Sequence, residues 1–289
     1  MSDIDIEYLR SWIGQSRQDQ DLIATRHARL MAATVNHPES AALVDGAELP
    51  PLWHWLYFLE GQPADRLGRD GHPARGQFLP PVPLANRMWA GGRLDFLAPV
   101  QLGTQVRKTS SILRVEHKAG RSGDLVFVTV LHELTAADGR PLVREEHDIV
   151  YKNKSPAPPA PPRSARAADT PHAATGGARR SLKPDSTQLF RYSALTFNGH
   201  RIHYDADYCR QVEGYPELVI HGPLLATLLA GFAIETSHRS LRHFTYRALA
   251  PALLGDVLTL QAEAQPDQLV LAATVDRGIT CMQAEAVLA

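Results

Sequence analysis

The stretch GPLLATLLAGFAIETSH, residues 222–238, decides the fold of this 289-residue chain. Apolar side chains dominate from Leu224 to His238 and predict a helix, and the preceding Gly222 and Pro223 suit the start of such a helix. A helix that is apolar nearly all round has to be buried on most of its sides. The apolar run 223–234 is too short to cross a bilayer, so we expect no membrane span.

Strand-like segments surround this helix in the second half of the chain. The predicted strands are Gln188–Leu195, Leu241–Ala248, Val257–Ala264 and a run from Leu269 to the C-terminus. A short helix is predicted over Asp205–Val212. An antiparallel sheet wrapped around a buried helix is a hotdog arrangement, so we expect an α+β fold in which strands dominate.

The first half has a similar order of elements. Helical spacing of apolar residues predicts helices over Ile6–Ile13 and Leu22–Val35, and the aromatic run Leu52–Phe58 is a predicted strand before a loop rich in Gly and Pro. Four more predicted strands follow, over Arg87–Phe96, Gln105–Glu116, Leu125–Leu134 and Leu142–Tyr151. The expected fold is therefore a double hotdog, two antiparallel sheets each wrapped around a central helix.

A segment rich in Pro and Ala separates the two halves. Ser155–Gly177, SPAPPAPPRSARAADTPHAATGG, has almost no large apolar side chains and cannot bury a core, which predicts an extended linker. The expected organisation is an N-terminal hotdog over 1–154, a linker over 155–182 and a C-terminal hotdog over 183–289.

Composition narrows the class of function. The formal net charge is −1, which disfavours a nucleic-acid or membrane-surface protein. Cys209 and Cys281 make neither a disulfide framework nor a zinc pattern, and the acidic N-terminus lacks a signal-peptide core. We expect a cytoplasmic protein. Metal-ligand spacing and a Gly-rich dinucleotide fingerprint are both missing from the sequence, so we expect no metal and no cofactor.

Polar residues that can carry chemistry gather at a predicted strand-to-helix junction. The segment FNGHRIHYD, residues 197–205, is followed by His221 and Gly222. Junction loops on a rigid scaffold are where catalytic side chains often lie. Local structural roles fit some of these residues equally well: Asn198 before Gly199 suits a turn, Asp205 suits a helix N-cap, and His221 can simply brace the loop.

The longer segment Tyr192–Asp205 resembles the hydratase motif of MaoC-like, double-hotdog enoyl-thioester hydratases, Leu-Ser-Gly-Asp-x-Asn-Pro-Ile-His. In that comparison Asn198 occupies the catalytic Asp position, His200 the Asn position and His203 the catalytic His position. The Asn-x-His-x-x-His variant resembles a subgroup: mesaconyl-C4-CoA and itaconyl-CoA hydratases and mitochondrial-type 3-hydroxyacyl-thioester dehydratases. Three further segments resemble that subgroup: Met88–Gly92, Lys118–Gly123 and Glu145–Tyr151.

The resemblance implies a thioester held in a tunnel between the hotdogs, with its carbonyl at the N-terminus of the long helix. A backbone N–H of Gly222 or Leu224 would stabilise the oxyanion, since Pro223 has no N–H. His203 would take a proton from water and deliver one to Cα, while Asn198 positions the water.

Four neighbouring residues complete the candidate site. His200 or Asp205 could orient the His203 ring, and Arg201 could bind a free carboxylate of the acyl group or simply be solvated. His221 is a candidate supporting residue. The N-terminal half would be catalytically degenerate, because its histidines are scattered: His54, His72, His117, His132 and His147.

The expected activity is reversible hydration of a short, branched, dicarboxylic enoyl-CoA, either mesaconyl-C4-CoA or itaconyl-CoA, by a homodimer. A 3-hydroxyacyl-thioester dehydratase of fatty-acid synthesis, acting on CoA or acyl-carrier-protein thioesters, is the alternative within the class. A thioesterase on the same fold is more distant. A non-catalytic thioester-binding subunit is the alternative from another class, and the missing Asp at residue 198 is the feature that favours it.

Overall fold

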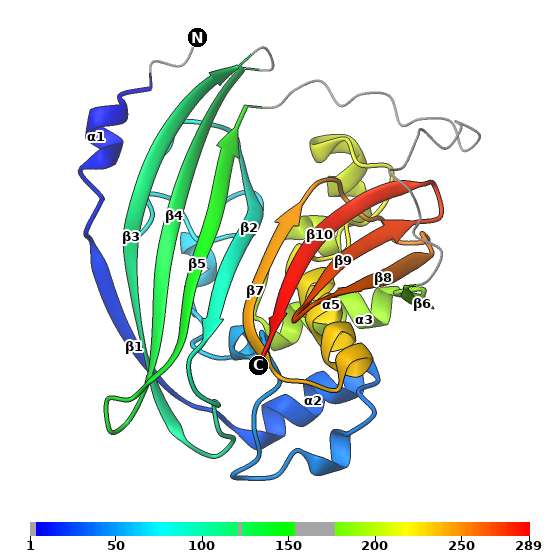
Figure 1. The fold of residues 1–289 in the computed structure, drawn as a ribbon. Coiled ribbons are helices and arrows are strands. Elements are labelled where there is room, and N and C mark those ends of the chain that lie inside the picture. Colours follow the sequence, from blue (N-terminus) through cyan, green and yellow to red (C-terminus); the bar gives the residue numbers. More distant parts are fainter. Residues whose placement is uncertain (1–3, 121–122, 154–176) are drawn as a thin grey trace.

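A computed structural model describes residues 4–120, 123–153 and 177–289. Within them ten strands form one antiparallel sheet in the order β1-β3-β4-β5-β2-β7-β10-β9-β8-β6 (Figure 1). The strands are β1 (Ser16–Leu22), β2 (Asn86–Phe96), β3 (Gln105–Gly120), β4 (Gly123–Ala136), β5 (Pro141–Lys152), β6 (Ala178–Leu182), β7 (Leu241–Ala248), β8 (Leu258–Gln265), β9 (Gln268–Val275) and β10 (Ile279–Leu288). Each half contributes five strands to the sheet, and the two halves meet at one strand pair.

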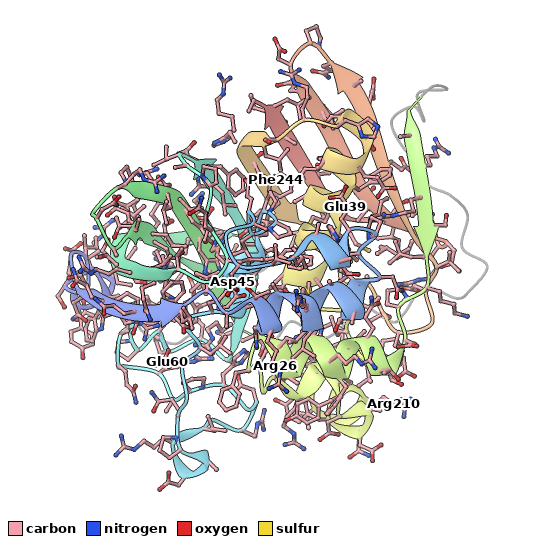
Figure 2. The ribbon with its side chains drawn as sticks, turned by 90° about the horizontal axis from the view of Figure 1, so that it is seen from below. Arg26, Glu39, Asp45, Glu60, Arg210 and Phe244 are labelled. Carbon is pink, nitrogen blue, oxygen red and sulfur yellow. The ribbon has the colours of Figure 1, made fainter. Side chains whose placement is uncertain are left out.

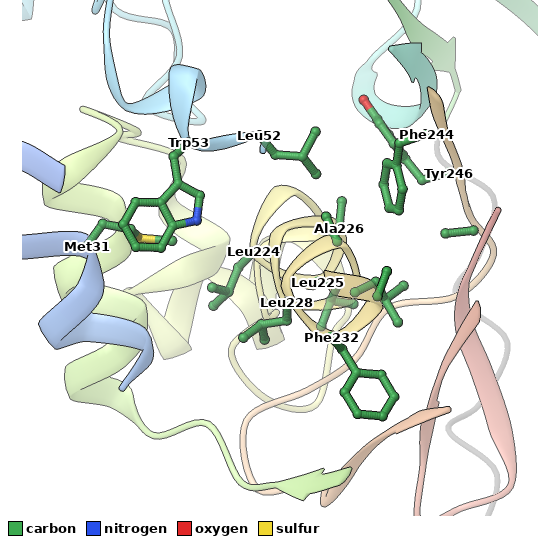
Figure 3. Packing of buried hydrophobic residues seen from close by; sticks show 14 of the residues in the cluster. Met31, Leu52, Trp53, Leu224, Leu225, Ala226, Leu228, Phe232, Phe244 and Tyr246 are labelled. Atoms are coloured by element: carbon green, nitrogen blue, oxygen red, sulfur yellow. The ribbon is translucent and has the colours of Figure 1, made fainter. Parts of the chain in front are cut away.

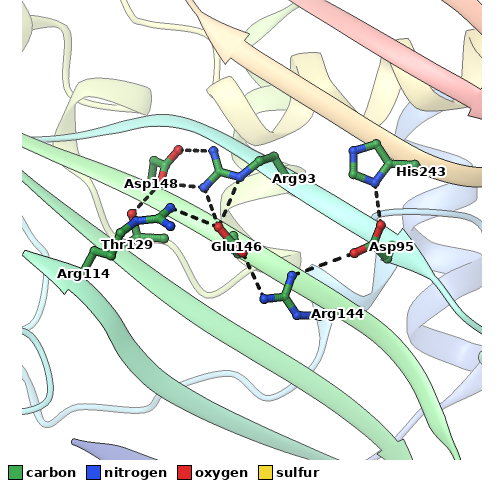
Figure 4. Close-up of polar contacts among 8 residues, drawn as sticks. All are labelled: Arg93, Asp95, Arg114, Thr129, Arg144, Glu146, Asp148 and His243. Carbon is green, nitrogen blue, oxygen red and sulfur yellow. Dashed lines mark hydrogen bonds and ion pairs between the residues drawn. The ribbon is translucent and has the colours of Figure 1, made fainter. Parts of the chain in front are cut away.

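That pair, β2 and β7, is the seam of the molecule. Leu94 lies opposite Phe244 in its register, and both side chains are fully buried. On the polar side of the seam, His243 of β7 contacts Asp95 of β2 through Nδ1 at 2.6 Å. Figure 4 shows how this contact continues into the ion pairs of Arg144 and Arg93 on the N-terminal sheet. Apolar burial therefore joins the halves, and polar pairs fix the register at their edge.

The apolar stretch over residues 222–238 forms α5 (Gly222–Ser237). It packs against β7, β8, β9 and β10, which curve around it. Seen along the helix, Leu224 lies on the side that faces Met31 and Trp53, while Phe244 and Tyr246 lie on the opposite side (Figure 3). Burial on both sides explains why nearly every α5 position is apolar. The expected double hotdog is confirmed.

Shorter helices cover the rest of the core. They are α1 (Ile6–Arg10), α2 (Thr25–Val35), α3 (Ser186–Leu195) and α4 (Ala206–Tyr208). Figure 2, the view from below, shows α2 with Arg26 beside α3, and the two helices are in contact. None of the helices in the described part of the chain is long and apolar enough to cross a membrane.

Two predicted strands are helices instead. Gln188–Leu195 lies in α3, where Leu189, Tyr192 and Leu195 are buried at a three-residue spacing and the Asp185 side chain caps the first turn. Leu52–Phe58 contains the 3₁₀ helix η2 (Trp53–Leu56). The two end residues of the predicted strand, Leu52 and Phe58, both have a positive φ, which is incompatible with a continuous strand.

Three further features differ from the sequence prediction. The run from Leu269 to the C-terminus is two strands, β9 and β10, rather than one. The polar strand β1 was not predicted, because its burial alternates only weakly and it pairs along the sheet edge. The predicted linker, 155–182, falls mostly outside the described residues. Its last five positions form β6, which pairs with β8 and so belongs to the C-terminal sheet.

Candidate active site

The motif segment forms a tight loop between α3 and α4. Phe197, two residues after the end of α3, has a positive φ of 49°, and the Asn198 side chain then accepts the backbone N–H of His200 at 3.0 Å. This contact is the local turn that Asn-Gly favours. Arg201–His203 continues as the 3₁₀ helix η4. Asn198 therefore has a structural role in the loop, and its amide N–H₂ is the part left to contact a water.

His203 is the buried residue of the motif, with 6% of its surface exposed. Its Nδ1 lies 2.7 Å from the carbonyl oxygen of Val219. Because a carbonyl only accepts, this contact assigns the proton to Nδ1 and leaves the lone pair on Nε2. Burial lowers the pKa of His203 to about 4, so the ring is neutral at pH 7. A neutral imidazole with a lone pair on Nε2 has the chemistry of a general base.

A second imidazole stacks on His203. The ring of His221 lies 3.6 Å from that of His203, centroid to centroid, at an angle of 19°. His221 is fully buried, and its Nε2 lies 2.8 Å from Oγ of Ser193. Its Nδ1 has no hydrogen-bond partner among the described residues. Burial and the neighbouring His203 lower the pKa of His221 well below its ordinary value. The residue precedes α5 and so ties the base to the helix N-terminus.

The first backbone amides of α5 are unpaired among the described residues. Neither the N–H of Gly222 nor that of Leu224 has an acceptor within the described part of the chain. The absence of a side chain at Gly222 is required, because a Cβ there would lie 2.9 Å from the Trp89 ring. Unpaired amides at a helix start stabilise developing negative charge. The position therefore has the chemistry of an oxyanion site.

Aromatic and polar side chains form the wall beside this helix start. Trp89 stacks on Tyr246 at 4.4 Å and meets Trp55 edge-on at 5.8 Å. Trp55 in turn donates to the buried carboxylate of Glu145, which also contacts His54 at 2.9 Å. Trp55 and Trp89 are partly exposed, whereas Trp53 is buried in the core. The wall therefore mixes ring faces with a buried, paired carboxylate.

One functional candidate comes from the first half of the chain. His72, in sequence one of five scattered histidines, lies with its ring 4.2 Å from that of His200. Its loop docks directly on the motif: the Asp70 carbonyl accepts the N–H of Arg201 at 2.9 Å. Gly71 is required at this contact, with a φ of +85° and a virtual Cβ only 2.0 Å from the Gly199 oxygen.

Asp70 and His72 form a pair within that loop. Asp70 accepts both the backbone N–H and the ring Nδ1 of His72, each at 3.1 Å. Burial alone would raise the pKa of Asp70, but these bonds and the His72 charge outweigh it and hold the pKa well below its ordinary value. Burial and the neighbouring His72 and His203 lower the pKa of His200 to about 2. Donor atoms of Asp70, His72 and His200 lie within 4.8 Å of one another, close enough to share a cation.

The last two predicted residues are held outside this arrangement. Arg201 pairs with Asp205 at 2.7 Å and lies over the Tyr208 ring at 4.3 Å. Asp205 also caps α4 by accepting the Tyr208 N–H at 2.9 Å. Val219, rather than Asp205, orients His203. The structure thus assigns Asp205 the capping role and engages the Arg201 cation with a neighbouring carboxylate.

Solved structures share this fold. A MaoC-like dehydratase superposes with a TM-score of 0.72 at 18% identity, covering 97% of this chain and 99% of the other. A Mycobacterium tuberculosis protein described as having a double hotdog fold superposes with a TM-score of 0.59 at 14% identity, covering 95% and 96%. At these identities the likeness concerns the fold alone.

Sequence relatives identify the class. The chain is 41% identical over 279 residues to the mesaconyl-C(4)-CoA hydratase of Chloroflexus aurantiacus, covering 93% of this chain and 97% of the relative. It is 26% identical over 260 residues to the mitochondrial hydroxyacyl-thioester dehydratase type 2 of Schizosaccharomyces pombe, covering 80% and 84%. The protein is an enzyme, a lyase of the hydratase and dehydratase class. Residues 52–254 match the family model of hydroxyacyl-thioester dehydratase type 2, and the chain belongs to that family.

The protonation state of His203 gives a pH dependence. We expect kcat/KM to stay level through neutral pH and to fall as the pH drops through about 4, because protonated His203 has no lone pair at Nε2. Initial rates across a pH series, with folding checked by circular dichroism at each pH, measure this. An acid limb centred at the ordinary histidine value of 6.5 would contradict a buried, neutral base.

Proposed function

We propose that this protein catalyses the reversible addition of water to the carbon–carbon double bond of a short, branched, dicarboxylic enoyl-CoA, of the mesaconyl-C4-CoA or itaconyl-CoA type. The observation that carries the proposal is the neutral His203, whose Nε2 keeps its lone pair and whose ring stacks on His221, directly before the amides of Gly222 and Leu224 that have no acceptor in the described part of the chain. Water addition needs a base on one side of the double bond and charge stabilisation at the thioester carbonyl.

The chemistry follows from these groups. Nε2 of His203 takes a proton from water while the oxygen bonds to Cβ, and the π electrons move toward the thioester carbonyl. The N–H groups of Gly222 and Leu224 stabilise the resulting enolate oxygen. Protonation of Cα completes the product. Water addition changes no net oxidation state, so the proposed reaction needs no redox cofactor.

A cation on β2 supports a dicarboxylic substrate. Arg87 and Trp89 are two residues apart on the strand and so face the same side, and Trp89 contacts Gly222. The Arg87 charge is close enough to lower the pKa values of His72 and His200. Arg201 is less suited to the role, because Asp205 already pairs with it. We therefore assign the free carboxylate of the acyl group to Arg87.

Replacement of Arg87 by methionine tests this assignment. We expect kcat/KM for mesaconyl-C4-CoA to fall about 10- to 100-fold, the usual cost of losing a hydrogen-bonded charge partner, while crotonyl-CoA, which has no second carboxylate, changes less than about threefold. Arg201→Met is the matched control and should leave the ratio of the two substrates unchanged. Equal losses on both substrates would contradict a carboxylate contact at Arg87.

Turnover of mesaconyl-C4-CoA, itaconyl-CoA and crotonyl-CoA by the wild-type enzyme tests the function as a whole. Loss of the enoyl-thioester absorbance on the first or second compound supports the proposal. The second candidate, a 3-hydroxyacyl-thioester dehydratase, is favoured by the match to that family and by the fission-yeast relative. It would be indicated by a strong preference for long apolar acyl chains on CoA or on acyl-carrier protein. Inactivity on every thioester would indicate a binding subunit.

The proposal extends to the assembly and its compartment. We propose a homodimer that works in the cytoplasm. The two cysteines support a reducing compartment, because Cys209 and Cys281 are both free and buried. Sedimentation velocity measures the association, and a monomer at every concentration would contradict it.

A further inference from the structure

Four imidazoles form a row through the candidate site. Ring centroids are 4.2 Å apart between His72 and His200, 5.5 Å between His200 and His203, and 3.6 Å between His203 and His221. Three members come from the C-terminal half, and His72 comes from the loop of the N-terminal half. The row therefore crosses the boundary between the two hotdogs.

A carboxylate stands at one end of this row. Both oxygens of Asp70 accept hydrogen bonds from His72, one from the ring and one from the backbone. The carboxylate of the motif itself, Asp205, instead accepts hydrogen bonds from Arg201 and from the first turn of α4. The N-terminal half thus supplies a carboxylate at the His72 end of the row.

We propose that Asp70 and His72 hold the proton during turnover: His72 receives, through His200, the proton that His203 takes from water, and returns it for the protonation of Cα. This inference rests on the proposed function and adds two positioning residues to it. Each transfer moves one proton between neighbouring rings, whose centroids are 5.5 Å apart for His203 and His200 and 4.2 Å apart for His200 and His72, and the row is neutral before and after the reaction. The water oxygen forms the bond to Cβ, and the π electron pair ends in the new C–H bond at Cα.

The contact between the His72 ring and the Asp70 carboxylate is the feature that favours a proton on His72. Burial holds the pKa of His203 at about 4 and, together with His72 and His203, that of His200 at about 2. Burial and the cations Arg87 and Arg75 also lower the pKa of His72, but the hydrogen bond and the charge of Asp70 oppose this effect. Binding of a cation by Asp70, His72 and His200 is the competing role for this cluster.

The test compares His72→Ala and Asp70→Asn with a matched pair at the seam, His243→Ala and Asp95→Asn. The control pair, drawn in Figure 4, has the same chemistry, with Nδ1 of His243 2.6 Å from Asp95, and neither residue belongs to the row. On whichever enoyl thioester the wild type hydrates, we expect kcat to fall about 100-fold in His72→Ala and about 10-fold in Asp70→Asn, with KM within about threefold. Free imidazole should restore part of the His72→Ala rate. The controls should stay within about twofold of wild type.

Several outcomes would overturn the inference. A His72→Ala enzyme whose kcat is within threefold of wild type would show that Asp70 and His72 take no part in turnover. An effect confined to KM would indicate a substrate contact instead. Activity that is abolished by a chelator and restored by Zn²⁺ alone indicates a metal site instead.

Ring ¹⁵N NMR provides a readout that is independent of turnover and so separates this inference from the proposed function. Asp70→Asn should lower the His72 pKa, whereas Asp95→Asn should leave it unchanged. If the wild type were inactive on every thioester, the proposed function would be wrong. This measurement would still show whether Asp70 raises the pKa of His72. An unchanged His72 pKa in Asp70→Asn overturns the pair.

Discussion

Replacing His203 with asparagine should lower kcat about 10²- to 10⁴-fold, the usual contribution of a positioned acid–base group. The amide of asparagine can still donate to the Val219 carbonyl, which now accepts Nδ1 at 2.7 Å, so the loop is expected to keep its conformation. What the variant loses is the lone pair at Nε2. The loss should therefore be seen in kcat rather than in thermal stability.

The measurement is the initial rate of enoyl-thioester hydration, with folding checked by circular dichroism. His203→Ala should lose as much activity, and His243→Asn serves as a control at a histidine outside the site. A folded His203→Asn enzyme with wild-type kcat would move the base to another residue. Loss of folding in asparagine and alanine variants alike would instead show that the buried ring is needed for packing.

Truncating Phe244 to alanine should cost about 3–5 kcal/mol of the free energy of unfolding. Its ring is fully buried at the seam, opposite Leu94 of the other half, and no solvent can reach the cavity that the substitution leaves. Because β7 joins the halves at this point, the loss affects the contact between the hotdogs as well as the packing on α5 (Figure 3).

Urea denaturation, followed by tryptophan fluorescence, measures this loss. Phe190→Ala is the matched control, because the Phe190 side chain on α3 is 66% exposed, and its midpoint should stay close to that of wild type. An equal midpoint for Phe244→Ala and wild type would show that the seam contributes little to stability. A split into two transitions would show that the halves unfold separately.

Periodicity succeeded wherever burial is dominated by one helix or one sheet face. The strands 86–152, which fold on neighbouring strands, were predicted to within a few residues at most ends. Periodicity gave the wrong element for Leu52–Phe58 and Gln188–Leu195. These segments are rich in aromatic and apolar residues, and that composition fits a buried helical turn as well as a strand. Only the packing surface distinguishes these two alternatives.

The sequence by itself determined the buried helix, the fold class and the motif that carries His203, because each depends on residues close together in the chain. It also supplied the resemblance that placed Gly222 at the start of that helix. It did not determine the neighbours of His203. Asp70 and His72 lie about 130 residues away in sequence from His200, and only the docking of Gly71 on Gly199 brings them to the motif.

The tertiary structure likewise decided which charged side chains pair with each other. Arg201 and Asp205 lie close to His203 in sequence but are paired with each other, whereas Arg87 comes from the distant strand β2. The physical reason is that the energy of a contact depends on distance in space and falls off within a few ångströms. In the folded protein, residues that are far apart in sequence can lie within that distance. A local pattern of residues can therefore indicate a candidate base, but only the folded structure determines which residues surround it.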